Sequence, residues 1–155
     1  MKQNMSQQSK NRVLPLLLLS LVVALPSLLP AADEWTDISV PLHETITGIS
    51  FISPSTGYIV TSGAKYARTV DSGKTWKVFT LAKDDPSYDD VFFLNKDTGI
   101  ICGRNGFVAR TSDGCKTWVR TFYGDTTIWF TSVVMIGSNH AVVVGMIPGD
   151  VPKGV

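Results

Sequence analysis

The sequence predicts an all-β protein made of β-propeller blades, with about two and a half four-stranded antiparallel units present. An octapeptide occurs twice, at Thr69–Trp76 and at Thr111–Trp118, with an offset of 42 residues. Short apolar segments and glycines upstream of both copies keep the same offset. After residue 32, no segment has the apolar period of an amphipathic helix. Repeats of about 40 to 50 residues that contain several short strands are typical of β-propellers.

The first 32 residues have the pattern of a secretory signal peptide. A basic segment with Lys2, Lys10 and Arg12 precedes an uncharged apolar run at residues 13–29, and small residues follow before the acids that begin at Asp33. The run contains two prolines and is short for a bilayer core of about 30 Å. We therefore expect export with a cleaved signal, and an uncleaved N-terminal anchor remains the alternative.

The second repeat shows the expected strands most clearly. They cover residues 91–94, 100–102, 107–111 and 117–122. Asn105-Gly106 between two β-prone runs predicts a hairpin, and Asp113-Gly114 predicts the turn that precedes the fourth strand.

A third copy begins at the same offset, where Val133 takes the place of Val91. We expect residues 33–155 to form a partial propeller with repeats near 46–87, 88–129 and 130–155. The octapeptide of the third repeat would fall at the end of the chain, so the sequence has the pattern of a C-terminally truncated fragment. A natural short form that completes its ring by oligomerisation is the alternative.

The repeated octapeptide resembles the Asp-box, Ser/Thr-x-Asp-x-Gly-x-Thr-Trp, of BNR-repeat propellers. The wider unit is most similar to the photosystem II assembly/stability factor family and its bacterial relatives. This resemblance implies a structural role for Thr69, Asp71, Gly73, Thr75 and Trp76, and for Thr111, Asp113, Gly114, Thr117 and Trp118.

The chemistry of the Asp-box residues fits a structural role. The Asp carboxylate can accept backbone N–H bonds within the turn, the glycine permits a positive φ, and the tryptophan closes an apolar face. Cys115 stands where the first copy has Gly73. We expect Gly114 to take the left-handed conformation in its place.

Candidate binding residues lie on the loops between the second and third strands, on the connections between blades, or just before each box. They are Arg68, Arg110, Arg104, Tyr88, Tyr123 and Trp129. The simpler interpretation is that the aromatic residues pack and that the arginine stems cover blade edges.

No metal site or cofactor is expected. Asp84, Asp85, Asp89 and Asp90 could offer oxygen ligands to Ca²⁺, but their spacing is not that of an EF-hand, and we expect a solvated acidic loop. His43 and His140 are isolated in the sequence.

The two cysteines are expected to remain free thiols. Cys102 and Cys115 fall at opposite ends of the repeat, about 20 Å apart at the usual rise of a strand, whereas a disulfide needs Cα atoms within about 7 Å. We expect Cys102 to be packed as a small apolar residue and Cys115 to be the more accessible thiol.

The family resemblance implies a non-catalytic exported propeller that acts as a protein-binding platform or assembly factor for a membrane-associated complex. Its location would be the periplasm, the extracellular side or the thylakoid lumen. The alternative is a fragment of a sialidase-type or other Asp-box glycoside hydrolase. Against it, no Arg-Ile-Pro segment occurs, and Glu44 is the only glutamate after Glu34. Without residues 1–32 the net charge is −2, so no nucleic-acid partner is expected.

Overall fold

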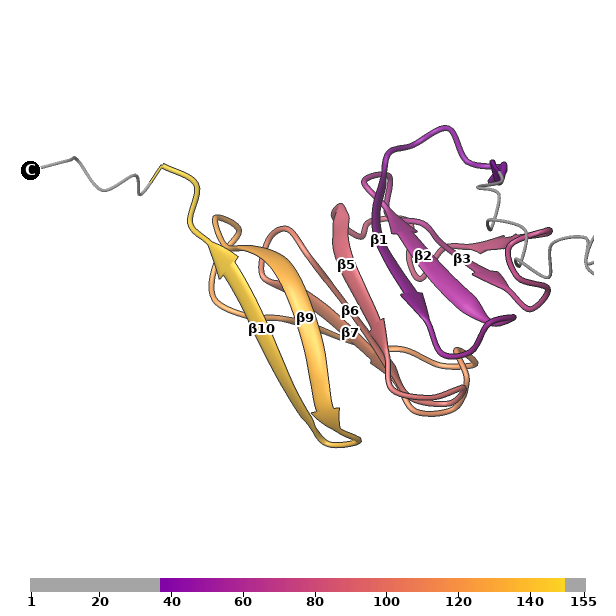
Figure 1. The fold of residues 1–155 in the computed structure, drawn as a ribbon. Helices are drawn as coiled ribbons and strands as arrows, with labels where there is room; N and C mark the ends of the chain where they lie inside the picture. The colour runs from indigo at the N-terminus through magenta and orange to yellow at the C-terminus, as the bar shows by residue number, and fades with distance from the viewer. Residues whose placement is uncertain (1–36, 150–155) are drawn as a thin grey trace, which may run out of the picture. The chain divides into compact units, whose positions relative to one another are not determined.

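The computed structural model describes residues 37–149, which form three antiparallel sheets in chain order (Figure 1). The first contains β1 (Ile46–Phe51), β2 (Gly57–Thr61), β3 (Tyr66–Thr69) and β4 (Lys77–Phe79). The second contains β5 (Tyr88–Phe93), β6 (Gly99–Gly103), β7 (Phe107–Thr111) and β8 (Val119–Phe122). The third contains β9 (Trp129–Gly137) and β10 (His140–Met146). None of the described residues is helical, which confirms the all-β prediction of two full blades and a partial one.

The signal peptide predicted at residues 1–32 lies outside the described residues. Between residues 37 and 149, no helix is long and apolar enough to cross a membrane.

The strand pairing repeats with the same offset as the sequence. Gly48 lies opposite Val60 in the first sheet, and Asp90 lies opposite Cys102 in the second. The register shifts at the corresponding point of the inner strand in all three sheets, at residues 47, 89 and 131. A bulge at a fixed place in each repeat bends the strand and increases its local twist. The repeat in the sequence is therefore also a repeat in backbone geometry.

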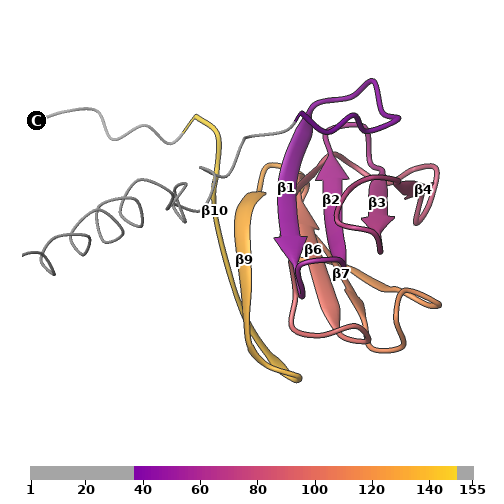
Figure 2. The same ribbon diagram turned by 45° about the vertical axis from the view of Figure 1, so that its right-hand side comes forward.

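Successive sheets pack face to face, and their first strands β1, β5 and β9 are neighbours (Figures 1 and 2). Hydrogen bonds join these inner strands across the sheets. The Phe93 N–H donates to Ser50 Oγ at 3.0 Å, and the Val133 N–H donates to Asp90 Oδ2 at 2.9 Å. The sheets are thus connected by specific polar contacts as well as by apolar packing.

The larger apolar core lies between the first and second sheets and is rich in aromatic residues. Its buried members are Tyr58, Val60, Tyr66, Tyr88, Val91, Phe93, Ile101, Phe107 and Ala109. The rings of Tyr58 and Phe93 stack with their centroids 3.5 Å apart. Trp118 meets Tyr66 and Phe93 edge-on, at 5.6 Å and 6.2 Å. Each such aromatic pair adds about 0.5–1.5 kcal/mol beyond the burial of area.

The core between the second and third sheets is smaller and mostly aliphatic. Its buried members are Ile100, Cys102, Val108, Val133 and Met135. Both cysteines are free thiols, Cys102 buried and Cys115 half-buried, as the sequence predicted. Burial raises the pKa of the Cys102 thiol to about 12, so this side chain is an inert apolar residue of the core.

Candidate functional site

The first Asp-box is a closed set of hydrogen bonds around one carboxylate. Asp71 accepts from the Thr75 N–H at 2.9 Å, from Thr75 Oγ1 at 2.6 Å and from Thr69 Oγ1 at 2.8 Å. Thr69 Oγ1 in turn accepts from the Gly73 N–H at 2.9 Å. These bonds, with the Thr75 hydroxyl first, lower the pKa of Asp71 to about 2. Such a carboxylate is ionised at neutral pH and unsuited to act as a general acid.

The second Asp-box repeats the arrangement. Asp113 accepts from the Thr117 hydroxyl at 2.6 Å and from the Thr117 N–H at 3.0 Å. The hydrogen bond from the Thr117 side chain is the largest cause of a pKa lowered to about 2. The turn is the same although its residues differ.

Both Asp-box turns contain two consecutive residues with positive φ. The pair is Ser72 (+63°) and Gly73 (+84°) in the first box, and Gly114 (+73°) and Cys115 (+67°) in the second. The expectation that Gly114 would take the left-handed conformation in place of Cys115 is therefore wrong, since both residues take it. The turn needs two left-handed positions, and each copy has glycine at only one of them.

The predicted solvated acidic loop is also wrong in part. The side chain of Asp84 is 84% exposed, but that of Asp85 is 0% exposed and forms an ion pair with Arg120. Asp85 also accepts from the Tyr88 hydroxyl at 2.6 Å. Among residues 37–149, no cluster of His, Cys, Asp and Glu side chains could hold a metal ion. The acidic segment connects one blade to the next.

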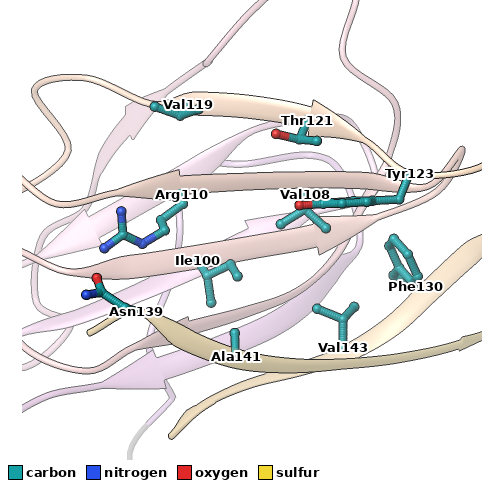
Figure 3. Close-up of a pocket in the computed structure, with 10 residues that line it drawn as sticks. All are labelled: Ile100, Val108, Arg110, Val119, Thr121, Tyr123, Phe130, Asn139, Ala141 and Val143. Atoms are coloured by element: carbon teal, nitrogen blue, oxygen red, sulfur yellow. The ribbon is translucent and has the colours of Figure 1, made fainter. Parts of the chain in front are cut away.

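A groove of about 560 Å³ lies between the second and third sheets and brings two of the candidate binding residues together (Figure 3). Its lining consists of Ile100, Val108, Arg110, Val119, Thr121, Tyr123, Phe130, Asn139, Ala141 and Val143. The Arg110 guanidinium donates to the Ser138 carbonyl at 2.7 Å, and the side chain of Tyr123 is 54% exposed. A smaller cavity of about 460 Å³ lies beside Trp118.

Arg104 and Trp129 form a cation–π pair on the connections between strands. The guanidinium carbon lies 4.4 Å from the centre of the indole ring, and the two residues also pair through their backbones. Arg68 lies on β3 instead, 5.7 Å from the ring centre of Tyr58. The two in-register arginines, Arg68 and Arg110, therefore lie at successive spaces between sheets.

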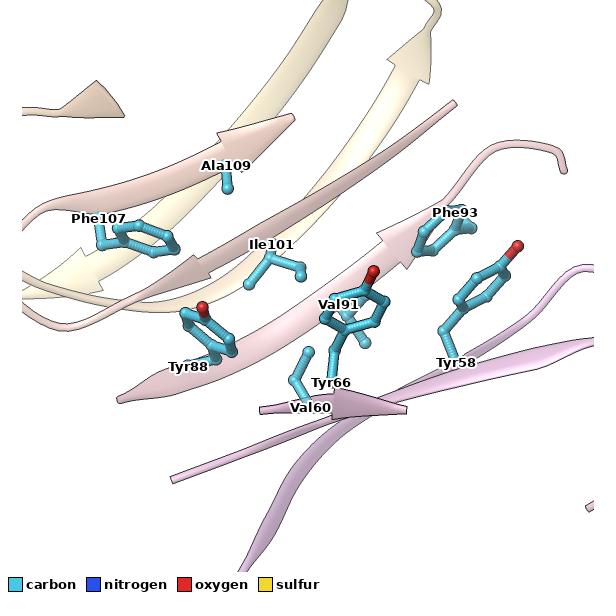
Figure 4. Close-up of a cluster of buried hydrophobic side chains, with 9 residues drawn as sticks. All are labelled: Tyr58, Val60, Tyr66, Tyr88, Val91, Phe93, Ile101, Phe107 and Ala109. Carbon is cyan, nitrogen blue, oxygen red and sulfur yellow. The ribbon is translucent and has the colours of Figure 1, made fainter. Parts of the chain in front are cut away.

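Tyr88 must be removed from the candidate binding residues. It is 0% exposed, and its ring stacks on Phe107 with centroids 5.3 Å apart. Figure 4 shows its side chain within the buried cluster between the sheets. The sequence analysis placed Tyr88 on a connecting loop, but strand β5 begins at this residue.

The sequence analysis did not find the groove. Its lining comes from the second and third sheets, far apart along the chain. The repeat offset was the available signal, because it aligns the groove residues with the filled space between the first two sheets.

Consecutive four-stranded antiparallel sheets with an Asp-box at the same place in each define a β-propeller of the BNR-repeat class. The chain belongs to the family described as photosynthesis system II assembly factor YCF48, whose model matches residues 29–126. This match confirms the resemblance inferred from the repeated octapeptide.

Two solved structures share the fold. "YCF48 bound to D1 peptide" is 27% identical with a TM-score of 0.61, over 69% of this chain and 36% of that one. "YCF48 from Cyanidioschyzon merolae" is 21% identical with a TM-score of 0.58, over 76% of this chain and 40% of that one. The chain thus spans well under half the length of both. Among curated proteins, no match was found.

Proposed function

We propose that the chain is part of a non-catalytic, exported assembly factor for photosystem II that binds a protein partner on the lumenal side of the membrane. The observation that supports this proposal most strongly is the family match over residues 29–126. A relative whose structure is described as bound to D1 peptide suggests that a D1 segment is the partner.

The accessible cations and aromatic residues on the second and third blades are the proposed contact surface. Arg104 is exposed and rests on Trp129, and Arg110 and Tyr123 line the groove. Arginine and aromatic residues are enriched in the energetically important parts of protein interfaces. A peptide with carboxylate groups would find charge-assisted hydrogen bonds there.

The geometry of the Asp-boxes favours binding over glycoside hydrolysis. A glycosidase needs one carboxyl group with a raised pKa opposite a second carboxylate. The pKa values of Asp71 and Asp113 are instead lowered to about 2 by hydrogen bonds within each turn. These two side chains serve the hairpins that carry them.

A binding titration of the full chain with D1 peptide tests the proposal. We expect Arg104→Ala to weaken binding about tenfold, equivalent to about 1.4 kcal/mol. Lys74→Ala is the matched control, because Lys74 is an exposed cation on the first Asp-box turn. Equal losses from the two variants would show that net charge, not this surface, determines binding. No binding by the unaltered chain would count against the D1 partner.

A further inference from the structure

The space between the first two sheets is filled by an Asp-box hairpin of the second sheet. Trp118, at the end of the box, lies against Tyr66 and Phe93. Cys115 of the same turn packs on the same core. The hairpin formed by β7 and β8 therefore closes the space that its own sheet shares with the preceding one.

The groove between the second and third sheets is the same space one repeat later. At the 42-residue offset, Tyr66 corresponds to Val108 and Phe79 to Thr121, and both Val108 and Thr121 line the groove. The third sheet has two strands, β9 and β10, within the described residues. No hairpin closes this groove among residues 37–149, and a cavity of about 560 Å³ remains.

The edge of β10 beside the groove has an unpaired row of backbone groups. In the first sheet the corresponding strand, β2, pairs with β3, whereas β10 pairs only with β9. Such an edge accepts a further strand readily. Its outward-facing side chains Val142 and Val144 are apolar and 46% and 55% exposed, so an added strand would also cover apolar surface.

The charge in the groove matches that of an Asp-box turn. In the filled space, Arg68 faces the second box: burial raises the pKa of the Cys115 thiol to about 11, and the charge of Arg68 opposes this rise. Arg110 occupies the corresponding position in the groove. An anionic turn placed there would meet a cation, as it does one repeat earlier.

We propose that the groove and the free edge of β10 together bind an Asp-box hairpin supplied in trans by another polypeptide. One strand of the hairpin pairs with β10, its tryptophan fills the groove, and its box carboxylate faces Arg110. The hairpins of this chain are not free to do so, because β3 is paired with β2 and β7 with β6. A second copy would have to exchange strands to occupy the site.

The probe is a fluorescent synthetic peptide with the sequence Tyr66–Phe79, which contains a complete Asp-box and no cysteine. It is titrated into the full 155-residue chain and followed by fluorescence anisotropy. We expect saturable binding, and at least tenfold weaker binding by the peptide with Trp76→Ala. Absence of binding, or equal affinity of the two peptides, would overturn the proposal.

Two variants of the chain locate the site. Ala141→Trp fills the groove and should abolish peptide binding, whereas Val142→Trp, on the exposed face of the same strand, should leave it unchanged. Arg110→Glu provides a second test if Ala141→Trp does not fold. It should weaken the unaltered peptide several-fold and the Asp71→Asn peptide less, since the repulsion acts on the box carboxylate. Equal effects of Ala141→Trp and Val142→Trp, or no effect of Arg110→Glu, would contradict the site.

The oligomeric state separates this site from exchange between copies. If the chain self-associates and Ala141→Trp dissociates it, the occupant is a second copy and the trans proposal is wrong. The D1 titration is independent of this test, because its arginine variant, Arg104→Ala, lies outside the groove lining.

Discussion

At the scale of single residues, the Asp-box turns show how little of the octapeptide is needed to keep its geometry. In each copy a threonine hydroxyl accepts a backbone N–H from the second left-handed residue, from Gly73 in one case and from Cys115 in the other. The aspartate holds the following threonine in both. The glycine is therefore a convenience of the backbone, whereas the Thr and Asp side chains make the turn.

Replacing Ser72 by glycine should stabilise the protein. Ser72 is exposed and has a φ of +63°, and a left-handed conformation costs a residue with a Cβ about 1–2 kcal/mol. Part of this gain is lost to the greater chain entropy of glycine in the unfolded state, so we expect about 0.5–1 kcal/mol. Chemical denaturation measures the change.

Ser112→Gly is the matched control, because Ser112 is exposed in the second Asp-box and does not have a positive φ. This substitution should be neutral or destabilising. A gain of equal size in both variants would show that backbone strain at Ser72 is not the cause.

The Asp-boxes should make stability depend on pH in the acid range. Hydrogen bonds lower the pKa of Asp71 and Asp113 from 3.8 to about 2 in the folded state. Because the unfolded state binds protons at higher pH, the stabilisation is complete above about pH 4 and is lost as the pH falls towards 2. Melting temperatures measured between pH 6 and pH 2 should fall in this window, and the double variant Asp71→Asn, Asp113→Asn should show a smaller fall.

At the scale of elements, the strands follow local signals closely, and the differences arise where a side chain is used elsewhere. Sequence reasoning placed the fourth strand of the second repeat at residue 117, but β8 begins at Val119 because Thr117 is held by Asp113. It began the first strand at residue 91, but β5 begins at Tyr88, where the buried ring requires pairing. Residues within one turn were predictable, whereas contacts between repeats depend on packing that no local pattern describes.

The two Asp-box tryptophans should differ in their contribution to stability. Trp118 packs on two aromatic rings of the core between sheets, whereas the aromatic contact of Trp76 is Phe51 of its own sheet, at 6.3 Å. We expect Trp118→Ala to cost about 3 kcal/mol, at the low end for a tryptophan because it is only partly buried. Trp76→Ala should cost clearly less. Denaturation midpoints compare them, and equal losses would mean that the hairpins, not the space between sheets, depend on these indoles.

At the scale of the whole molecule, the sheets close on their neighbours but leave apolar faces uncovered. Val142, Val144 and Met146 on β10 are each about half exposed. An apolar strand at the edge of a sheet promotes association between chains. The proposed binding of a hairpin in trans and unwanted association would use the same strand.

A lysine on β10 should reduce self-association of the full chain. We expect Val144→Lys to shift the protein towards monomer in size-exclusion chromatography with light scattering, because charge on an edge strand opposes edge-to-edge pairing. Val119→Lys is the control: it adds the same charge to β8, at the position where the first repeat has Lys77. If both lysines act equally, the effect is one of net charge.

The hydrogen bonds between inner strands offer a way to observe the blades separating. The amides of Phe93 and Val133 donate to side chains of the preceding sheet, Ser50 and Asp90. Their exchange with deuterium requires only that two sheets come apart, while amides inside each ladder also require the ladder to open. Comparing the two sets by NMR would measure the free energy that holds one blade to the next, apart from the free energy that holds each blade together.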